Sequence, residues 1–119
     1  MTLIELATKA KSAKYQIALL STEAKNRGIA AVADALEANA DDIISANNID
    51  MENGLKKGLS AGLLDRLKLD KARISGMAEG LRQVADLEDP IGKVTEKWIR
   101  PNGLEISKRL VPIGVVGVI

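Results

Sequence analysis

Apolar residues recur three and four positions apart through the first ninety residues, which is the spacing of one face of an α-helix. Thr2 and the pair Ser21-Thr22 each stand before such a stretch, and hydroxyl side chains there accept hydrogen bonds from the free N–H groups of a helix start. We therefore expect one helix from Thr2 to about Leu20 and another after Thr22. The second stripe continues past Asn39, where Asn39 and Asp42 resemble a capping pair and predict a break between two helices.

Three further residues predict helix ends and starts. Gly58 follows two basic residues and fits the left-handed position that terminates a helix. Ser60 is placed to cap a short helix through Leu67, and Asp70 to cap another whose apolar stripe runs from Ile74 to Val84 and Ala85. The first ninety residues thus predict a layer of about five helices.

Two glycines, Gly76 and Gly80, lie four apart on the last of these helices. Each costs about 1 kcal/mol relative to alanine in a helix interior, so a structural reason is expected. We expect a close approach by another backbone, and tight packing is favoured over a ligand site.

After Asp89-Pro90 the pattern changes to alternating and β-branched residues, which indicate strands. The run from Arg100 to Leu104 predicts a three-residue hairpin loop, with Pro101 fixing its first residue and Gly103 in the left-handed position. A two-residue turn would instead set Lys97 against Lys108. The expected cross-strand pairs are Arg100 with Leu104, Trp98 with Ile106, Glu96 with Lys108, and Val94 with Leu110.

The last nine residues, Val111 to Ile119, form a β-branched run interrupted only by Pro112, Gly114 and Gly117. Such a run is typical of a strand buried on both faces in a parallel α/β sheet. Its glycines lie inside the strand, where a close approach of backbone or cofactor would explain them. A parallel neighbour needs a crossover of a dozen or more residues, so the sequence reads as if cut at the opening strand of a larger α/β domain.

Composition narrows the classes of function. The 119 residues carry a net charge of +1 with both signs interspersed, which does not provide the basic patch that nucleic acid requires. The longest apolar stretch is too short to span a membrane and the start does not resemble a secretory signal, so we expect no membrane partner and a cytoplasmic location. The length fits one domain.

The chain contains neither cysteine nor histidine. This excludes thiolate nucleophiles, Cys/His zinc sites and imidazole bases within these residues. The acidic residues Asp34, Glu37, Asp41 and Asp42 fit a solvated helix face better than a calcium loop, which needs alternating ligands around a glycine. The residues alone therefore predict no catalytic residue and no metal site.

Several segments nevertheless form a specific series. They are Leu20–Asn26, Ala33–Asn39, Leu63–Leu67, Gly76–Ala85, Asp89–Gly92, Arg100–Leu104 and Val111–Ile119. Together they resemble the N-terminal part of the gamma-glutamyl phosphate reductases (glutamate-5-semialdehyde dehydrogenases), a branch of the aldehyde dehydrogenase superfamily. The run Gly-Met-Ala-Glu-Gly-Leu-Arg-Gln at 76–83 and the Arg-Pro-Asn-Gly turn are specific to this branch, and the final strand is shared across the superfamily.

The resemblance implies NADPH-dependent reduction of L-glutamyl 5-phosphate to L-glutamate 5-semialdehyde with phosphate release, the second step of proline biosynthesis. In that family a cysteine thiolate attacks the acyl phosphate and NADPH reduces the resulting thioester. Family members continue for some three hundred further residues that hold this cysteine, so no catalytic residue carries over and this chain alone is expected to be inactive.

The resemblance also implies a fold. It is an α/β fold in which residues 1–119 are the N-terminal part of the NADP-binding domain: the helical layer, a hairpin at 93–111 on the oligomerisation surface, and the first strand of a Rossmann-like cofactor domain of the aldehyde dehydrogenase type. Ile119, at the carboxyl end of that strand, is the one residue expected to touch the cofactor. The implied partners are the small-molecule substrate and further copies of the chain.

Two alternatives stay open. The chain could be a free-standing helical and hairpin interaction module without catalysis, using the hairpin as a docking edge. It could also belong to the same superfamily but act on another aldehyde or acyl phosphate, although the branch-specific runs argue against this. Appreciable turnover by the 119-residue chain would contradict the expected inactivity, whereas a stable, monodisperse, cooperatively folding chain would favour the module.

Overall fold

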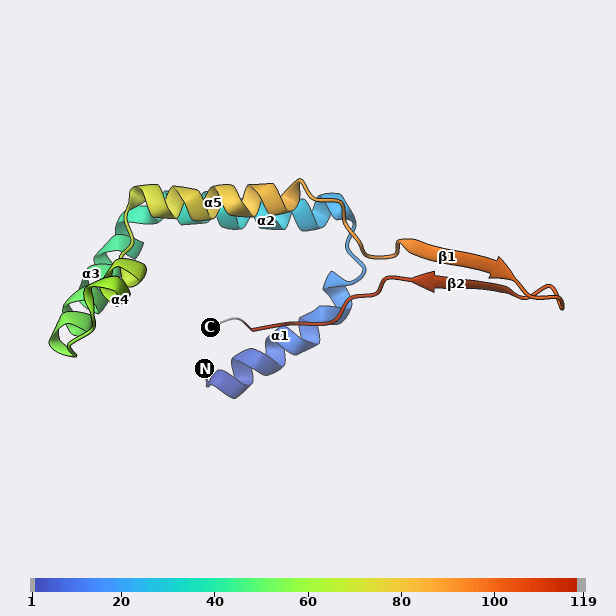
Figure 1. Ribbon diagram of the computed structural model, residues 1–119, viewed down its shortest axis with the longest axis horizontal. Coiled ribbons are helices and arrows are strands. Elements are labelled where there is room, and N and C mark those ends of the chain that lie inside the picture. Colours follow the sequence, from blue (N-terminus) through green and yellow to red (C-terminus); the bar gives the residue numbers. More distant parts are fainter. Residues whose placement is uncertain (1, 118–119) are drawn as a thin grey trace. The chain divides into compact units, whose positions relative to one another are not determined.

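A computed structural model describes residues 2–117, which form five helices and two strands (Figure 1). The chain divides into two compact units, one of residues 23–87 and one of residues 1–22 with 88–119. We call them the helical unit and the hairpin unit. The expectation of a single domain from chain length stays a prediction, because each of these units is a compact cluster of contacts and not by itself a domain. None of the described helices is both long and apolar enough to cross a lipid bilayer.

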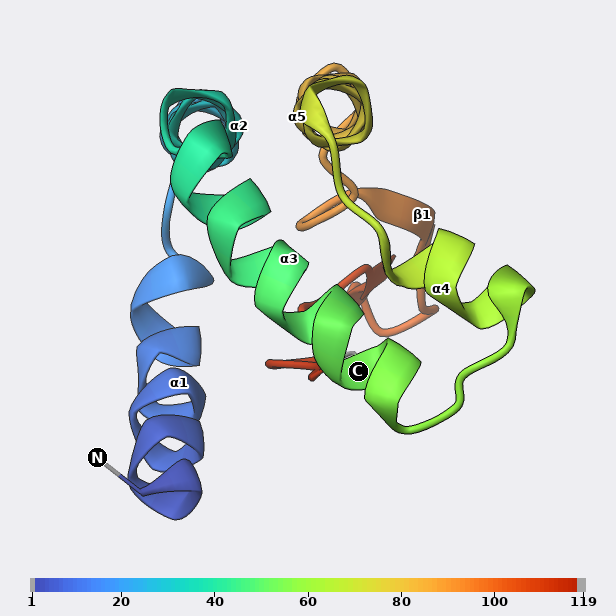
Figure 2. The ribbon, with the colours of Figure 1, turned by 90° about the vertical axis from the view of Figure 1, so that its left-hand side faces the viewer.

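The helical unit contains four helices: α2 (Thr22–Ala38), α3 (Ala40–Lys56), α4 (Ala61–Leu67) and α5 (Lys71–Ala85). Figures 1 and 2 both show α5 lying alongside α2, and α4 contacts α3. Ala33 on α2 and Ala78 on α5 are fully buried, and Ile74 is 1% exposed. These three side chains are the buried hydrophobic core among the described residues.

The predicted caps of this unit are confirmed. Ser60 Oγ accepts a hydrogen bond from the backbone N–H of Leu63, and Asp70 Oδ1 accepts one from that of Arg73. Gly58 has a φ of 74°, the left-handed conformation expected after a helix. Helices α4 and α5 begin where the sequence predicts because a single side chain there satisfies a free backbone donor.

The break at Asn39 is confirmed, but the capping pair is wrong. The Asn39 side chain makes no cap bond to α3 and instead donates from Nδ2 to the carbonyl oxygen of Ala35, 2.8 Å away, near the end of α2. Asparagine carries both a donor and an acceptor, so it can serve the helix before it as well as the helix after it.

The glycine interpretation is also corrected. A Cβ added at Gly76 or Gly80 would meet nothing within 4 Å, so no other backbone comes close to them in the described residues. The close approach is at Gly54, which is buried on α3: a Cβ there would lie 3.0 Å from Leu59 Cδ1 and 3.1 Å from Leu64 Cδ2. Packing therefore requires glycine at position 54, because Leu59 and Leu64 fill the space that a side chain there would need.

The hairpin unit begins with α1 (Leu3–Ile17), which ends three residues before the expected Leu20. Thr2 forms the predicted cap: its side chain accepts from the Glu5 backbone, and the Glu5 carboxylate accepts from the Thr2 backbone N–H. The helix therefore starts with a complete capping box.

Two antiparallel strands form the rest of the described hairpin, β1 (Val94–Ile99) and β2 (Glu105–Arg109). The pairs Trp98–Ile106 and Glu96–Lys108 are confirmed, and Gly103 has the expected positive φ of 85°. Arg100 N–H donates to the Leu104 carbonyl oxygen at 2.9 Å. Val94 pairs with Arg109 rather than with Leu110, because the register shifts by one residue between Val94 and Glu96.

Residues 111–117 belong to no strand, so the expected Rossmann-like strand is not confirmed. A strand needs a neighbour that accepts its backbone hydrogen bonds, and within the described residues β1 and β2 pair only with each other. The last residues of the expected strand, Val118 and Ile119, lie outside the described part of the chain.

Candidate functional site

The segment expected to lead to the cofactor lies along α1 within the hairpin unit. One apolar face of α1 and residues 113–117 line an open hollow together. Its lining is Leu3, Leu6, Ala7, Ala10, Lys11 and Lys14 from α1, with Ile113, Gly114, Val115 and Gly117. The two lysines are its only charged side chains, and Lys14 Nζ lies 4.7 Å from the centre of the Tyr15 ring. The hollow is an apolar surface with a cationic rim.

Its glycines do not form a phosphate cradle. A Cβ on Gly114 or Gly117 would meet nothing within 4 Å, so no other backbone among the described residues comes close to them, and the alternative of a cofactor stays a prediction. Gly114 has a φ of 130°, which explains a glycine by backbone conformation alone. Ile119, the predicted cofactor contact, lies outside the described residues.

The acidic candidates on α2 and α3 pair with basic side chains of α5. Arg82 on α5 donates from Nη2 to Asp34 Oδ1 at 2.9 Å and to Glu37 Oε2 at 2.7 Å. Ser75 Oγ donates to the second oxygen of Glu37 at 3.3 Å. Asp41 pairs in the same way with Lys71, 2.9 Å away. These carboxylates link α2 and α3 to α5.

This cluster sets the charge state of its members. The hydrogen bond from Arg82 lowers the pKa of Glu37, partial burial opposes that effect, and the charge of Arg82 and the Ser75 hydroxyl add to it. The hydrogen bonds that Arg82 makes to Glu37 and Asp34 raise the pKa of Arg82 above its usual range. Glu37 is therefore held as a carboxylate, which suits an ion pair and not a proton donor.

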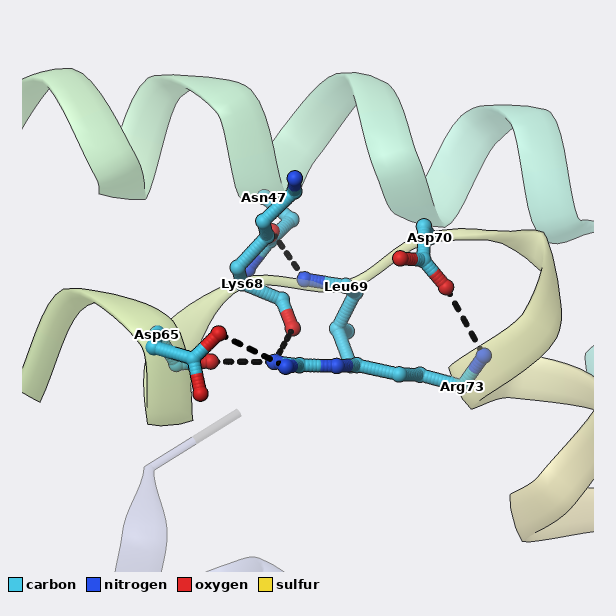
Figure 3. A network of polar contacts seen from close by, with 6 residues as sticks. All are labelled: Asn47, Asp65, Lys68, Leu69, Asp70 and Arg73. Atoms are coloured by element: carbon cyan, nitrogen blue, oxygen red, sulfur yellow. Dashed lines mark hydrogen bonds and ion pairs between the residues drawn. The ribbon is translucent and has the colours of Figure 1, made fainter. Parts of the chain in front are cut away.

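A second polar cluster fixes the segment between α4 and α5 (Figure 3). Asn47 on α3 is 6% exposed; its Nδ2 donates to the Leu67 carbonyl oxygen at 2.9 Å, and its Oδ1 accepts from the Leu69 N–H at 2.7 Å. Arg73 reaches back from α5 to the Asp65 carboxylate at 2.8 Å and to the carbonyl oxygens of Asp65 and Lys68. The Asn47 amide and the Arg73 guanidinium both bind the short stretch of backbone between residues 65 and 69.

Sequence reasoning missed Asn47 and Arg73. Asn47 lies beside Asn48 in a polar stretch, and nothing in the pattern separates the buried asparagine from the exposed one. The usable signal was the apolar spacing of α3, on which Asn47 follows Ile43 and Ile44 by four and three positions.

The chemistry available to the described residues is structural. No group of three or more Asp and Glu side chains in residues 2–117 is arranged to hold a metal ion, and the sequence offers no Cys or His ligand. The polar clusters join one helix to another, and the hollow beside the expected strand is lined by apolar residues and two lysines. Ser75 Oγ does donate to the Glu37 carboxylate, but that carboxylate is already paired with Arg82.

Comparisons with known proteins extend this picture. No family model matches the chain. It is 56% identical over 116 residues to a gamma-glutamyl phosphate reductase of Clostridium novyi and 54% identical over 114 residues to that of Desulforamulus reducens, covering 98% and 96% of this chain. The crystal structure of gamma-glutamyl phosphate reductase from Thermotoga maritima matches 93% of the chain with a TM-score of 0.89 at 36% identity. The enzyme from Saccharomyces cerevisiae matches 87% with a TM-score of 0.75, also at 36% identity.

The resemblance predicted from the sequence is therefore confirmed along nearly the whole chain, in sequence and in fold. The chain spans 28% of the length of these two curated relatives, and 27% and 26% of the two solved chains. The five helices and the hairpin are the shared part of the fold.

Proposed function

We propose that the chain is the N-terminal part of a gamma-glutamyl phosphate reductase. The whole enzyme would use NADPH to reduce L-glutamyl 5-phosphate to L-glutamate 5-semialdehyde with release of phosphate, the second step of proline biosynthesis, in the cytoplasm. The observation that supports this is the 56% identity over 116 residues to a reductase of that name, together with the TM-score of 0.89 to another. The branch-specific run at 76–83 supports the same substrate.

The 119 residues alone are proposed to be inactive. They contain no cysteine, and the family's reaction needs a thiolate nucleophile. NADPH supplies hydride to such a reaction, but the described residues present neither a glycine cradle nor converging polar groups for it. Residues 1–119 would contribute the N-terminal part of the NADP-binding domain, with Ile119 as their contact to the cofactor, and most of the site would come from elsewhere in the enzyme.

A chimera tests this proposal. The 116 matched residues of the Clostridium novyi reductase would be replaced by those of this chain, and phosphate-dependent reduction of NADP by glutamate 5-semialdehyde would be measured. We expect kcat/KM within about tenfold of the unaltered enzyme, a cost of less than about 1.4 kcal/mol. The control chimera carries Ala78→Asp, a charge at a fully buried position, and should lose activity with its helical unit.

Two results would count against the proposal. A soluble chimera with intact helical circular dichroism and no activity would show that this chain cannot replace the reductase segment. Turnover by the 119-residue chain on its own would show that the required groups lie within it. Binding of the chain to another protein with no effect in the chimera would instead favour the interaction module.

The hairpin at 93–111 is proposed to be part of the oligomerisation surface. Ile99 is 65% exposed and Leu104 57% exposed, so the hairpin presents apolar side chains that a second subunit would cover. In the active chimera, Ile99→Asp should lower the mass measured by light scattering, whereas Ile4→Asp, at a comparably exposed position on α1, should not. An unchanged mass in the Ile99→Asp variant would contradict this assignment.

A further inference from the structure

We infer that the helical unit, residues 23–87, folds and unfolds as a cooperative unit separate from the hairpin unit. The first support is the location of the core. Every residue that is buried in the described part of the chain lies in the helical unit: Ala33, Asn47, Gly54, Ile74 and Ala78. Burial of this kind makes unfolding cooperative, because each buried side chain depends on several neighbours.

The second support is the way the unit is closed. Asn26, one turn into α2, donates from Nδ2 to the carbonyl oxygen of Ala85, the last residue of α5, at 2.7 Å. Just outside, Thr22 Oγ1 donates to Asp89 Oδ2 at 3.1 Å. The points where the chain enters and leaves the helical unit are therefore adjacent. Adjacent ends are typical of modules that can be inserted into another fold.

The third support is a set of ion pairs inside each unit. Four ion pairs within the helical unit join α5 to each of its other three helices: Arg82 to Asp34 and Glu37, Lys71 to Asp41, and Arg73 to Asp65. Within the hairpin unit, Lys97 pairs with Glu105 and Lys108 with Glu96 across the two strands, and Lys93 pairs with Glu88 in the segment before β1. If one unit unfolds, the ion pairs named here for the other unit stay in place.

The sequence provides a separate optical signal for each unit. Tyr15 and Trp98 are the only aromatic residues, and both belong to the hairpin unit. Helices α2 to α5 hold about four fifths of the helical residues, so circular dichroism at 222 nm reports mainly on the helical unit. In a urea titration of the 119-residue chain, we expect Trp98 emission to change at lower urea than the main, sigmoidal loss of ellipticity.

Two substitutions make the test decisive. Ile74→Val removes one methylene from the core of the helical unit and should lower the ellipticity midpoint by roughly 0.5–1 M urea while leaving the Trp98 curve in place. Gly103→Ala forces a non-glycine residue into a φ of 85° at the hairpin turn and should shift only the Trp98 curve. Both changes are mild enough to leave the unsubstituted unit measurable.

The outcomes separate cleanly. Coincident curves that move together in both variants would overturn the inference, as would a gradual loss of ellipticity without a transition. Amide hydrogen exchange on the same chain gives an independent reading: amides in α2 to α5 should share one high opening free energy, with those of β1 and β2 below it. This experiment does not depend on the proposed enzyme activity and can fail while that proposal stands.

Discussion

Asn47 is the side chain whose removal should damage the helical unit most for its size. It is 6% exposed and makes two hydrogen bonds to backbone groups on either side of Lys68, one to the Leu67 carbonyl oxygen and one from the Leu69 N–H. Figure 3 shows it bridging from α3 to the segment that joins α4 to α5. Asn47→Ala therefore removes the partners of two backbone groups and leaves a small void.

The magnitude follows from what those groups lose. A buried donor or acceptor left without its partner costs about 1–3 kcal/mol, and Leu67 and Leu69 are half-buried, so water reaches part of the gap. Two groups at the lower end of that range give a loss of roughly 2–3 kcal/mol. A unit of this length has a total stability of about 3–10 kcal/mol, so the variant should lose a large fraction of it.

The assay is urea unfolding followed by ellipticity at 222 nm, with Asn48→Ala as the matched control. Asn48 is the next residue on α3 and is exposed, so both variants gain the same helix propensity and only one loses the bridge. The free energy of unfolding should differ between them by roughly 2–3 kcal/mol. A difference below about 0.5 kcal/mol, with the slope of the transition unchanged, would show that the bridge contributes nothing and would refute the reasoning.

Three further predictions concern the same unit. Gly76→Ala should stabilise it by roughly 0.5–1 kcal/mol because its Cβ enters open space, whereas Gly54→Ala should be destabilising or neutral; equal stabilisation of both in urea unfolding would contradict the packing argument. Since folding lowers the pKa of Glu37, the ionised Glu37 side chain stabilises the folded state fully above its ordinary pKa of about 4.5, and this stabilisation is lost as the pH falls through the pKa of the folded state. Glu37→Gln should therefore weaken the fall of the urea midpoint at acid pH. Arg73→Lys keeps the charge but loses the fork that reaches three oxygens, and should lower the thermal midpoint even at high salt, where a simple surface ion pair would show no effect.

Local chemistry explains which parts of the fold were predictable. Thr2, Ser60 and Asp70 each satisfy a backbone donor within three residues of themselves, and Gly58 and Gly103 each supply a positive φ that neighbours cannot. Such features are complete within a few consecutive residues, so the sequence shows both partners. The hairpin register follows the same logic except at the β-bulge, where one extra residue shifts Val94 by one position.

Features that join distant residues were not predictable in the same way. The need for glycine at position 54 comes from Leu59 and Leu64 across the α3–α4 contact, and the burial of Asn47 comes from the backbone around Lys68. Gly76 looks more constrained than Gly54 in the sequence, because it sits in the cleaner apolar stripe. The candidate site was less predictable still, since its expected contact, Ile119, lies beyond the described residues and its expected strand has no described partner.

Apolar residues at helix or strand spacing are therefore buried in the helical unit and exposed in the hairpin unit. The difference is whether another described segment covers them. Helix α5 contacts α3 within the chain, and Ile74 on α5 is 1% exposed. In the hairpin unit, Leu3 is 80% exposed and Ile113 is 97% exposed, although their sequence context predicts burial just as strongly. Hydrophobic side chains gain free energy only when something covers them. Under the proposed function, the covering surface would be the part of the reductase outside this segment, since the chain matches 28% of the length of these relatives. The apolar residues of the hairpin unit should therefore be less exposed to solvent in the chimera than in the isolated chain.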